Sequence, residues 1–205
     1  MKKLKITIVM ITFLSICLSI PFNTSTVYGA MEDPTPINSQ EEAPKELIDN
    51  VQSLEKYIVV GKNNELVFDV EKAEKDGATP EQLAQGREFN KFSSQYSSAN
   101  VKKSRIKPGL PIYGNWCGPG HGGKSMNNPK PENNLDYRCM EHDLCYAKVG
   151  YFHCTCDRNL LWGILKSYPY MKSGEKAMAT TVYTYFLLQM KARFCGNIDM
   201  PGAPR

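Results

Sequence analysis

The chain is poor in histidine and tryptophan, and it has no apolar run long enough to cross a bilayer. Its 205 residues include three histidines and two tryptophans, and cysteine is absent between Cys17 and Cys117. The one long apolar stretch, residues 6–20, is shorter than the ~20 residues that a spanning helix needs. Neither an internal repeat nor a nucleic-acid-binding motif is evident. These absences argue against an integral membrane protein, a repeat protein and a nucleic-acid partner.

The first 30 residues predict export. Three lysines precede the apolar stretch, and small and polar residues follow it up to Ala30. This order is typical of a secretory signal peptide, whereas a membrane anchor would need a longer apolar run. We therefore predict a signal peptide at residues 1–30, cleaved after Gly29 or Ala30, and a secreted, extracellular protein.

Cysteine is concentrated in the second half of the exported chain. An even number of cysteines in a secreted protein favours a disulfide framework. The alternative is a zinc site that combines some of these cysteines with His142 and His153, but a single residue between two cysteines fits zinc spacing poorly. The six cysteines left after export are Cys117, Cys139, Cys145, Cys154, Cys156 and Cys195.

Charge divides the exported chain into two parts. Residues 31–100 carry 14 acidic and 7 basic side chains, whereas residues 101–205 carry 15 basic and 7 acidic ones. We expect the acidic and basic parts to attract each other. A basic part is also drawn to anionic surfaces, and for an exported chain an anionic phospholipid membrane is the expected one.

The acidic N-terminal segment, residues 31–105, is predicted to be mostly helical up to Tyr96. Residues 65–70 suit a short strand, and Thr79 followed by proline and Gln82 is typical of a helix start. Lys102, Lys103 and Arg105 lie in a polar stretch that offers protease sites. A removable pro-segment and a permanent partner domain are both compatible with this pattern. The helical spacing of the segment is carried by Leu47, Ile48, Val51, Leu54 and Ile58.

The second half, residues 106–205, predicts one all-helical unit stapled by disulfides. A loop rich in glycine and proline comes first, and Asn134 is then placed to cap a helix over residues 136–150. Two further helices are expected over residues 154–166 and 175–194.

The run "LDYRCMEHDLCY" at residues 135–146 carries the chemistry. On a helix, Cys139, His142 and Cys145 occupy neighbouring positions along one side. If Cys139 pairs with Cys117, the glycine loop lies close to Asp143. A carboxylate among backbone carbonyls forms an oxygen ligand set that suits calcium.

A second crosslink is compatible with an antiparallel helix pair. Facing residues in such a pair have numbers with a nearly constant sum, and the pairs Cys145 with Cys156 and His142 with Asp157 fit one register. A carboxylate on one ring nitrogen of histidine leaves the other nitrogen free as a base. Cys154 with Cys195 is then the remaining pair, although six cysteines allow many other pairings.

Three motifs together resemble the secreted phospholipase A2 family. "YGNWCGPG" at 113–120, "DYRCMEHDLCY" at 136–146 and "CDRNLL" at 156–161 are similar to its calcium loop, its active-site helix and the partner helix. The match covers about fifty of the 205 residues. Only a short stretch of chain separates His142 from Asp157, with no room for a hairpin between them. In this respect the chain resembles the small bacterial and fungal branch of the family.

The resemblance implies a fold and an activity. The fold is an all-α unit, in which a disulfide-stapled antiparallel helix pair carries a calcium loop. The activity is calcium-dependent hydrolysis of the sn-2 ester of glycerophospholipids. His142 would be the general base, Asp157 would support its imidazolium, Tyr146 would bind Asp157, and the Gly118 amide would stabilise the oxyanion.

The resemblance also implies calcium as the cofactor. Its ligands would be the Asp143 carboxylate and the backbone oxygens of Trp116, Gly118 and Gly120. Asp136 matches a family aspartate, and its role is expected to be structural.

Two residues depart from the family pattern. His121 stands where the family loop often has glycine, and Arg138 replaces a cysteine of the animal enzymes. His121 and His153 are expected to be solvated loop residues, and Trp162 suits a core position as well as a surface one. Six aromatic residues could form a lipid-facing rim: Trp116, Tyr151, Phe152, Trp162, Tyr168 and Tyr170.

The main functional alternative is a non-catalytic, toxin-like relative that binds membranes or a protein through the same scaffold. The loss of His142, Asp143 or Asp157 would have favoured it. Since all three are present, the enzyme is the preferred hypothesis.

Overall fold

A computed structural model describes residues 43–62, 64–96, 112–122, 127–196 and 200–201. The chain divides into two units, Met1–Glu32 and Asp33–Arg205, and every described residue belongs to the second. The predicted signal peptide and the predicted protease sites lie outside the described residues. Within the described ranges, no helix is long and apolar enough to cross a bilayer.

The N-terminal segment is mostly helical, as predicted. Its elements are α1 (Lys45–Glu55), β1 (Ile58–Val60), β2 (Leu66–Phe68), α2 (Val70–Lys75) and α3 (Pro80–Gln95). The start of α3 is a capping box: the Thr79 hydroxyl accepts from the Gln82 N–H at 3.2 Å, and the Gln82 side chain accepts from the Thr79 N–H at 2.9 Å. The prediction of a helix start at Thr79 is confirmed.

A two-stranded sheet departs from the all-α prediction. Ile58 was assigned to the helical pattern of the first helix, but it lies in β1 and pairs with Phe68 of the antiparallel β2. Three consecutive β-branched residues favour an extended backbone there. The strand predicted at 65–70 is confirmed but shorter, because Asp69 instead caps α2 and accepts from the Lys72 N–H at 2.9 Å.

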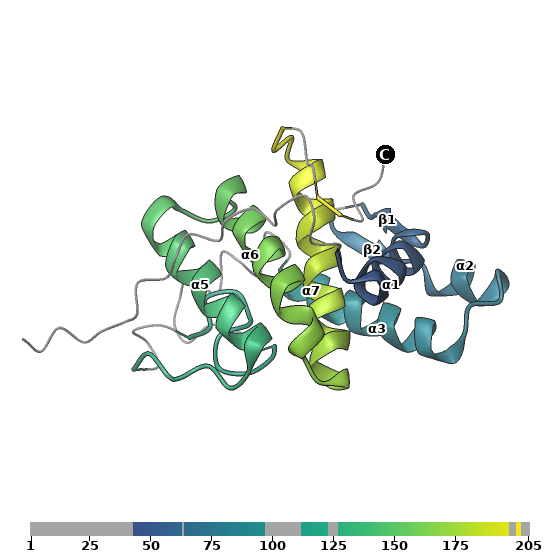
Figure 1. The fold of residues 1–205 in the computed structure, drawn as a ribbon. Coiled ribbons are helices and arrows are strands. Elements are labelled where there is room, and N and C mark those ends of the chain that lie inside the picture. The colour runs from purple at the N-terminus through teal and green to yellow at the C-terminus, as the bar shows by residue number, and fades with distance from the viewer. Residues whose placement is uncertain (1–42, 63, 97–111, 123–126, 197–199, 202–205) are drawn as a thin grey trace, which may run out of the picture. The chain divides into compact units, whose positions relative to one another are not determined.

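The second half contains α5 (Asn134–Val149), α6 (Cys154–Ser167), η2 (Tyr168–Tyr170) and α7 (Ser173–Ala192), in good agreement with the three predicted helices. The cap of α5 was placed one residue too late. Asn133, rather than Asn134, has the extended backbone of a cap, and its side chain accepts from the Asp136 N–H at 3.1 Å. Figure 1 shows α5, α6 and α7 side by side.

Three disulfides confirm the expected connectivity. They join Cys117 to Cys139, Cys145 to Cys156, and Cys154 to Cys195. Because all six cysteines are crosslinked, none is available as a zinc thiolate, which removes the basis of the zinc alternative.

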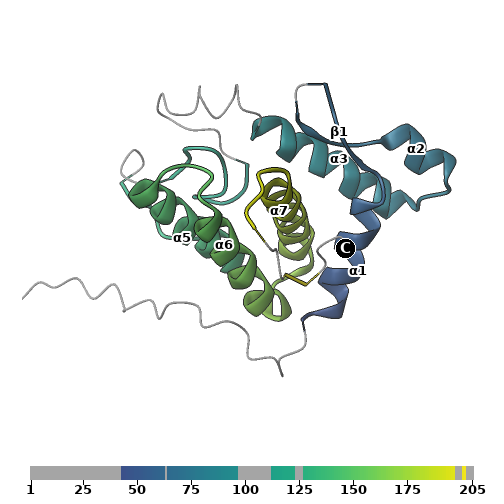
Figure 2. The ribbon, with the colours of Figure 1, turned by 90° about the horizontal axis from the view of Figure 1, so that it is seen from above.

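Helix α7 lies between the two halves of the described chain. Figure 2 shows α5 and α6 on one side of it and α1 and α3 on the other. Phe92 of α3 packs edge-to-face on Tyr185 and Phe186 of α7, with ring centroids 5.3 and 6.5 Å apart. The Gln85 amide donates to the Ala177 carbonyl at 2.8 Å and to Thr181 Oγ1 at 2.6 Å. One hydrophobic core therefore runs through both halves.

We predict that weakening the N-terminal segment also destabilises the second half of the chain. Phe92→Ala should lower the free energy of unfolding by about 3–5 kcal/mol, because Phe92 is fully buried against α7. The readout is tryptophan fluorescence during denaturant unfolding, since both tryptophans, Trp116 and Trp162, lie in the second half.

Val60→Ala is the matched control, because Val60 is 63% exposed in the same segment. It should change the stability by less than about 0.5 kcal/mol. A fluorescence midpoint that Phe92→Ala left unchanged would mean that the two halves unfold independently.

Candidate active site

The centre of the candidate site is a buried pair of side chains from two helices. His142 of α5 and Asp157 of α6 have side chains that are 3% and 0% exposed, and His142 Nε2 lies 2.9 Å from Asp157 Oδ1. The Cys145–Cys156 disulfide crosslinks the same two helices beside them. With Nε2 directed at a carboxylate, the imidazole carries its proton there and leaves Nδ1 as the basic nitrogen.

Tyr146 completes the environment of Asp157. Its hydroxyl donates to the same Oδ1 atom that His142 contacts. Burial raises the pKa of Tyr146, and the neighbouring Asp157 charge and hydrogen bond raise it further, so the phenol remains a neutral donor. The other oxygen, Asp157 Oδ2, is buried and has no hydrogen-bond partner among the described residues.

Two aromatic residues that the sequence did not indicate lie beside the site, one against the imidazole and one behind it. The ring of Phe186, on α7, meets His142 edge-to-face at 4.8 Å. Tyr96, at the end of α3, packs on Phe186 at 5.5 Å. Burial raises the pKa of Tyr96, and the charges of Asp143 and Asp157 contribute to the shift, which places its phenol within the field of the site. The N-terminal segment therefore supplies part of the site wall.

The glycine loop is anchored by Asp136. Its fully buried carboxylate accepts the backbone N–H groups of Trp116 at 2.8 Å, Asn115 at 3.0 Å and Glu132 at 2.9 Å. Gly114 passes so close that an added Cβ would lie 2.4 Å from the Asp136 carboxyl carbon, and its φ of 56° suits glycine. This agrees with the structural role expected for Asp136.

The same loop is tied to α5 at a second point. A short antiparallel bridge joins Tyr113 to Cys117, and the Cys117–Cys139 disulfide fixes the loop to α5. The path of the loop beside α5 is thus fixed by one carboxylate and one crosslink.

The predicted calcium ligands share this region, and their chemistry fits the ion. Within the described ranges, Asp143 has neither a hydrogen bond nor an ion pair, although it is partly buried. Burial raises the pKa of Asp143 well above its ordinary value of 3.8, and the nearby Asp136 carboxylate adds to the shift. A cation beside Asp143 would offset both effects.

The remaining predicted ligands are backbone carbonyls. Gly118 and Gly120 have φ angles of 151° and 68°, which side-chain-bearing residues rarely adopt. The Gly118 carbonyl accepts the His121 N–H at 3.1 Å and keeps a second lone pair. No group of three or more His, Cys, Asp or Glu side chains suited to a metal occurs in the described part of the chain. The protein ligands of a metal bound here would be carbonyl oxygens and one carboxylate, a set of oxygen ligands that suits calcium.

The predicted exposure of several residues is wrong. Trp116 is 2% exposed, with its indole N–H donating to the Pro129 carbonyl at 2.7 Å, and Tyr168 is also buried, so neither faces lipid. His121 was expected in solvent but is 7% exposed beside the Gly114 carbonyl. His153 is exposed as predicted.

Arg138 has a structural role between α5 and α6. Its Nε donates to Ser167 Oγ at 2.8 Å, and its other end pairs with Glu141 at 2.7 Å. Arg138 thereby connects α5 to the far end of α6.

We predict that calcium stabilises the protein through Asp143. In chelator at neutral pH, Asp143→Asn should raise the melting temperature, because it removes an uncompensated carboxylate. The rise should be roughly 2–4 °C for each kcal/mol gained in the free energy of unfolding. A carboxyl whose pKa is raised on folding loses stability as the pH rises from its ordinary 3.8 through the raised value, so the gain should vanish in more acidic buffer. Calcium should raise the melting temperature of the wild type and leave the variant unchanged.

The control is Asp76→Asn. The hydrogen bond from Lys72 lowers the pKa of Asp76, so its carboxylate stabilises the fold, and the substitution should lower the melting temperature slightly. An equal calcium response in wild type and Asp143→Asn would contradict the assignment of Asp143 as a ligand.

Comparison with known proteins gives no relative. The chain matches no family model, no curated protein and no solved structure. The function of this site therefore has to be argued from its own residues and geometry.

Proposed function

We propose that this protein is a secreted, calcium-dependent phospholipase A2. It hydrolyses the sn-2 ester of glycerophospholipids at a membrane surface and releases a fatty acid and a lysophospholipid. The observation that carries the proposal is the buried hydrogen bond of 2.9 Å between His142 and Asp157, with Asp143 adjacent on the same helix. A general base and a calcium ligand are thus neighbours along α5.

The proton path begins at His142. Its Nδ1 removes a proton from the water molecule that attacks the ester carbonyl, and the imidazole becomes positively charged. The imidazolium then returns the proton to the sn-2 oxygen as the ester C–O bond breaks and the lysophospholipid leaves. Asp157, at the opposite nitrogen, stabilises that charge and fixes the ring orientation. Tyr146 holds the Asp157 carboxylate in place through its hydroxyl.

The oxyanion is stabilised from the glycine loop. The Gly118 N–H donates no hydrogen bond to a described residue, so it is available for the developing charge. Asp143 and the carbonyls of Trp116, Gly118 and Gly120 would hold calcium, which when bound polarises the ester carbonyl.

The site is dry enough for this chemistry. Phe186 and Tyr146 enclose the imidazole with ring centroids at 4.8 and 4.1 Å, and the Asp157 side chain is wholly inaccessible to solvent. In such surroundings, charge–charge and charge–dipole interactions are stronger than in water. The disulfides are compatible with an extracellular location.

The direct test is fatty-acid release from sn-2-labelled phospholipid by residues 31–205. This length keeps the N-terminal segment, whose Tyr96 contacts the site wall. We expect release with calcium and none with excess chelator. His142→Gln should lower the rate by roughly 10²- to 10⁴-fold, because the general base is removed.

His153→Gln is the matched control, since His153 is exposed at the start of α6, and its rate should equal that of the wild type. The near-ultraviolet circular dichroism of both variants reports whether the fold is intact. Calcium-independent release, or an unchanged rate in a folded His142→Gln protein, would reject the proposed mechanism.

A further inference from the structure

Phe194, just after the end of α7, is a large apolar side chain that the fold does not use. It is 93% exposed, so it adds almost nothing to the core. Its φ of 55° lies in the left-handed region, where glycine would be unstrained and phenylalanine is uncommon. That conformation ends α7: the Phe194 N–H donates to the Lys191 carbonyl at 3.2 Å and the Cys195 N–H to the Met190 carbonyl at 3.1 Å. The backbone is therefore accounted for within the chain, whereas the exposed aromatic side chain is not.

Phe194 belongs to a small crosslinked surface. The Cys154–Cys195 disulfide joins the residue after Phe194 to the start of α6, close to Phe152. The Arg193 guanidinium lies 3.8 Å from the centroid of the Phe152 ring. Val149, at the end of α5, is 53% exposed. We call Val149, Phe152 and Phe194 the apolar tip.

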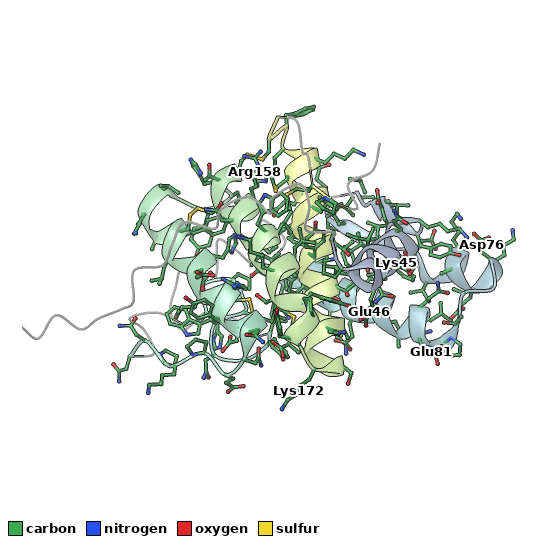
Figure 3. All side chains as sticks on the ribbon, viewed as in Figure 1. Lys45, Glu46, Asp76, Glu81, Arg158 and Lys172 are labelled. Carbon is green, nitrogen blue, oxygen red and sulfur yellow. A yellow bond between two sulfur atoms is a disulfide. The ribbon has the colours of Figure 1, made fainter. Side chains whose placement is uncertain are left out.

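Basic residues flank the apolar tip. Lys148 precedes Val149, Arg193 precedes Phe194, and Arg158 is the fifth residue of α6. Figure 3 shows Arg158 near the end of α7 that carries the tip, whereas Lys172 marks the other end of that helix. The one acidic residue between Lys148 and Arg158 is Asp157, which is fully buried.

An acidic residue of another element does approach this end. Lys191, in the last turn of α7, interacts electrostatically with Glu55 of α1. Its charge is therefore partly offset, and we do not count it among the flanking bases.

The apolar tip reaches the candidate active site through Phe152. The ring of Tyr146, which donates to Asp157, lies 6.2 Å from the Phe152 ring and 5.2 Å from the Tyr151 ring. Along α5, Val149 is about 10 Å beyond His142 at 1.5 Å per residue. A surface that meets the tip would thus lie next to the site.

We propose that the apolar tip, with Lys148, Arg158 and Arg193 around it, is the docking surface for an anionic phospholipid bilayer. Apolar side chains enter the boundary between headgroups and acyl chains, while basic side chains at their edge bind the headgroup phosphates. A small protrusion suits this partner better than a protein, because a stable protein interface covers about 800 Å² on each side.

This inference rests on the proposed function and adds an orientation to it. The tip would hold the end of α5, and with it His142, against the bilayer that supplies the substrate. The sequence included Phe152 in a lipid-facing rim but gave no indication of Phe194.

The test is co-sedimentation of residues 31–205 with vesicles in chelator, so that no hydrolysis occurs. Phe194→Ser should weaken binding to phosphatidylglycerol-containing vesicles about tenfold, by the loss of one inserted aromatic side chain. Arg193→Gln and Lys148→Gln should each weaken it roughly fivefold at low salt. Binding to pure phosphatidylcholine should be weak in every case.

Matched controls come from the far end of the same helices. Tyr170→Ser removes an aromatic side chain that is 79% exposed in η2, and Lys172→Gln removes a base that precedes α7. Both should bind like the wild type. Equal binding by Phe194→Ser and wild type, or equal losses in the controls, would overturn the docking surface, as would equal binding to neutral vesicles.

A second substrate separates this inference from the proposed activity. Hydrolysis of a dispersed short-chain phospholipid needs the active site but no bilayer, so Phe194→Ser should retain it while losing activity on vesicles. Hydrolysis of that substrate without tip-dependent binding would reject the docking surface alone. Tip-dependent binding without hydrolysis of either substrate would support the docking surface and reject the activity.

Discussion

The imidazole of His142 and the carboxylate of Asp157 can meet because α5 and α6 pack antiparallel in one register. The Cys145–Cys156 disulfide fixes that register, and a shift of a single residue would separate the two groups. The glycine loop is in turn fixed to α5, through the Cys117–Cys139 disulfide. Crosslinks substitute here for the extensive core that a short helical unit cannot build by itself.

Three carboxylates near this helix pair differ in how many hydrogen bonds compensate their burial. The difference distinguishes a carboxylate that organises the loop from two that keep oxygens without a described partner. Asp136 accepts three backbone N–H groups and organises the loop. Asp157 is compensated by Tyr146 and His142 at one oxygen, which leaves the second oxygen without a described partner. Asp143 has no compensating donor among the described residues. Uncompensated buried charge is costly, so it persists where a ligand or a reaction requires it.

Helix α7 connects the α5–α6 pair to the acidic segment that precedes it in the chain. One side of α7 carries Phe186 against His142, and its contacts with Phe92 and Tyr96 belong to the same aromatic cluster. The two halves also share an ion pair of 2.6 Å between Lys176 and Glu46. Because the segment contributes to the core and to the site wall, these contacts favour a permanent partner over a removable pro-segment.

The sequence by itself determined the features that depend on neighbours along the chain. Short motifs and the register of a helix pair indicated His142, Asp143 and Asp157, and local capping chemistry indicated the start of α3. These features depend on spacing along one helix or across two helices joined by a short turn. The aromatic wall from Phe186 and Tyr96 was decided by tertiary structure. It depends on which surfaces meet across a long separation in the chain, and hydrophobic periodicity indicates that a residue is buried without indicating its partner.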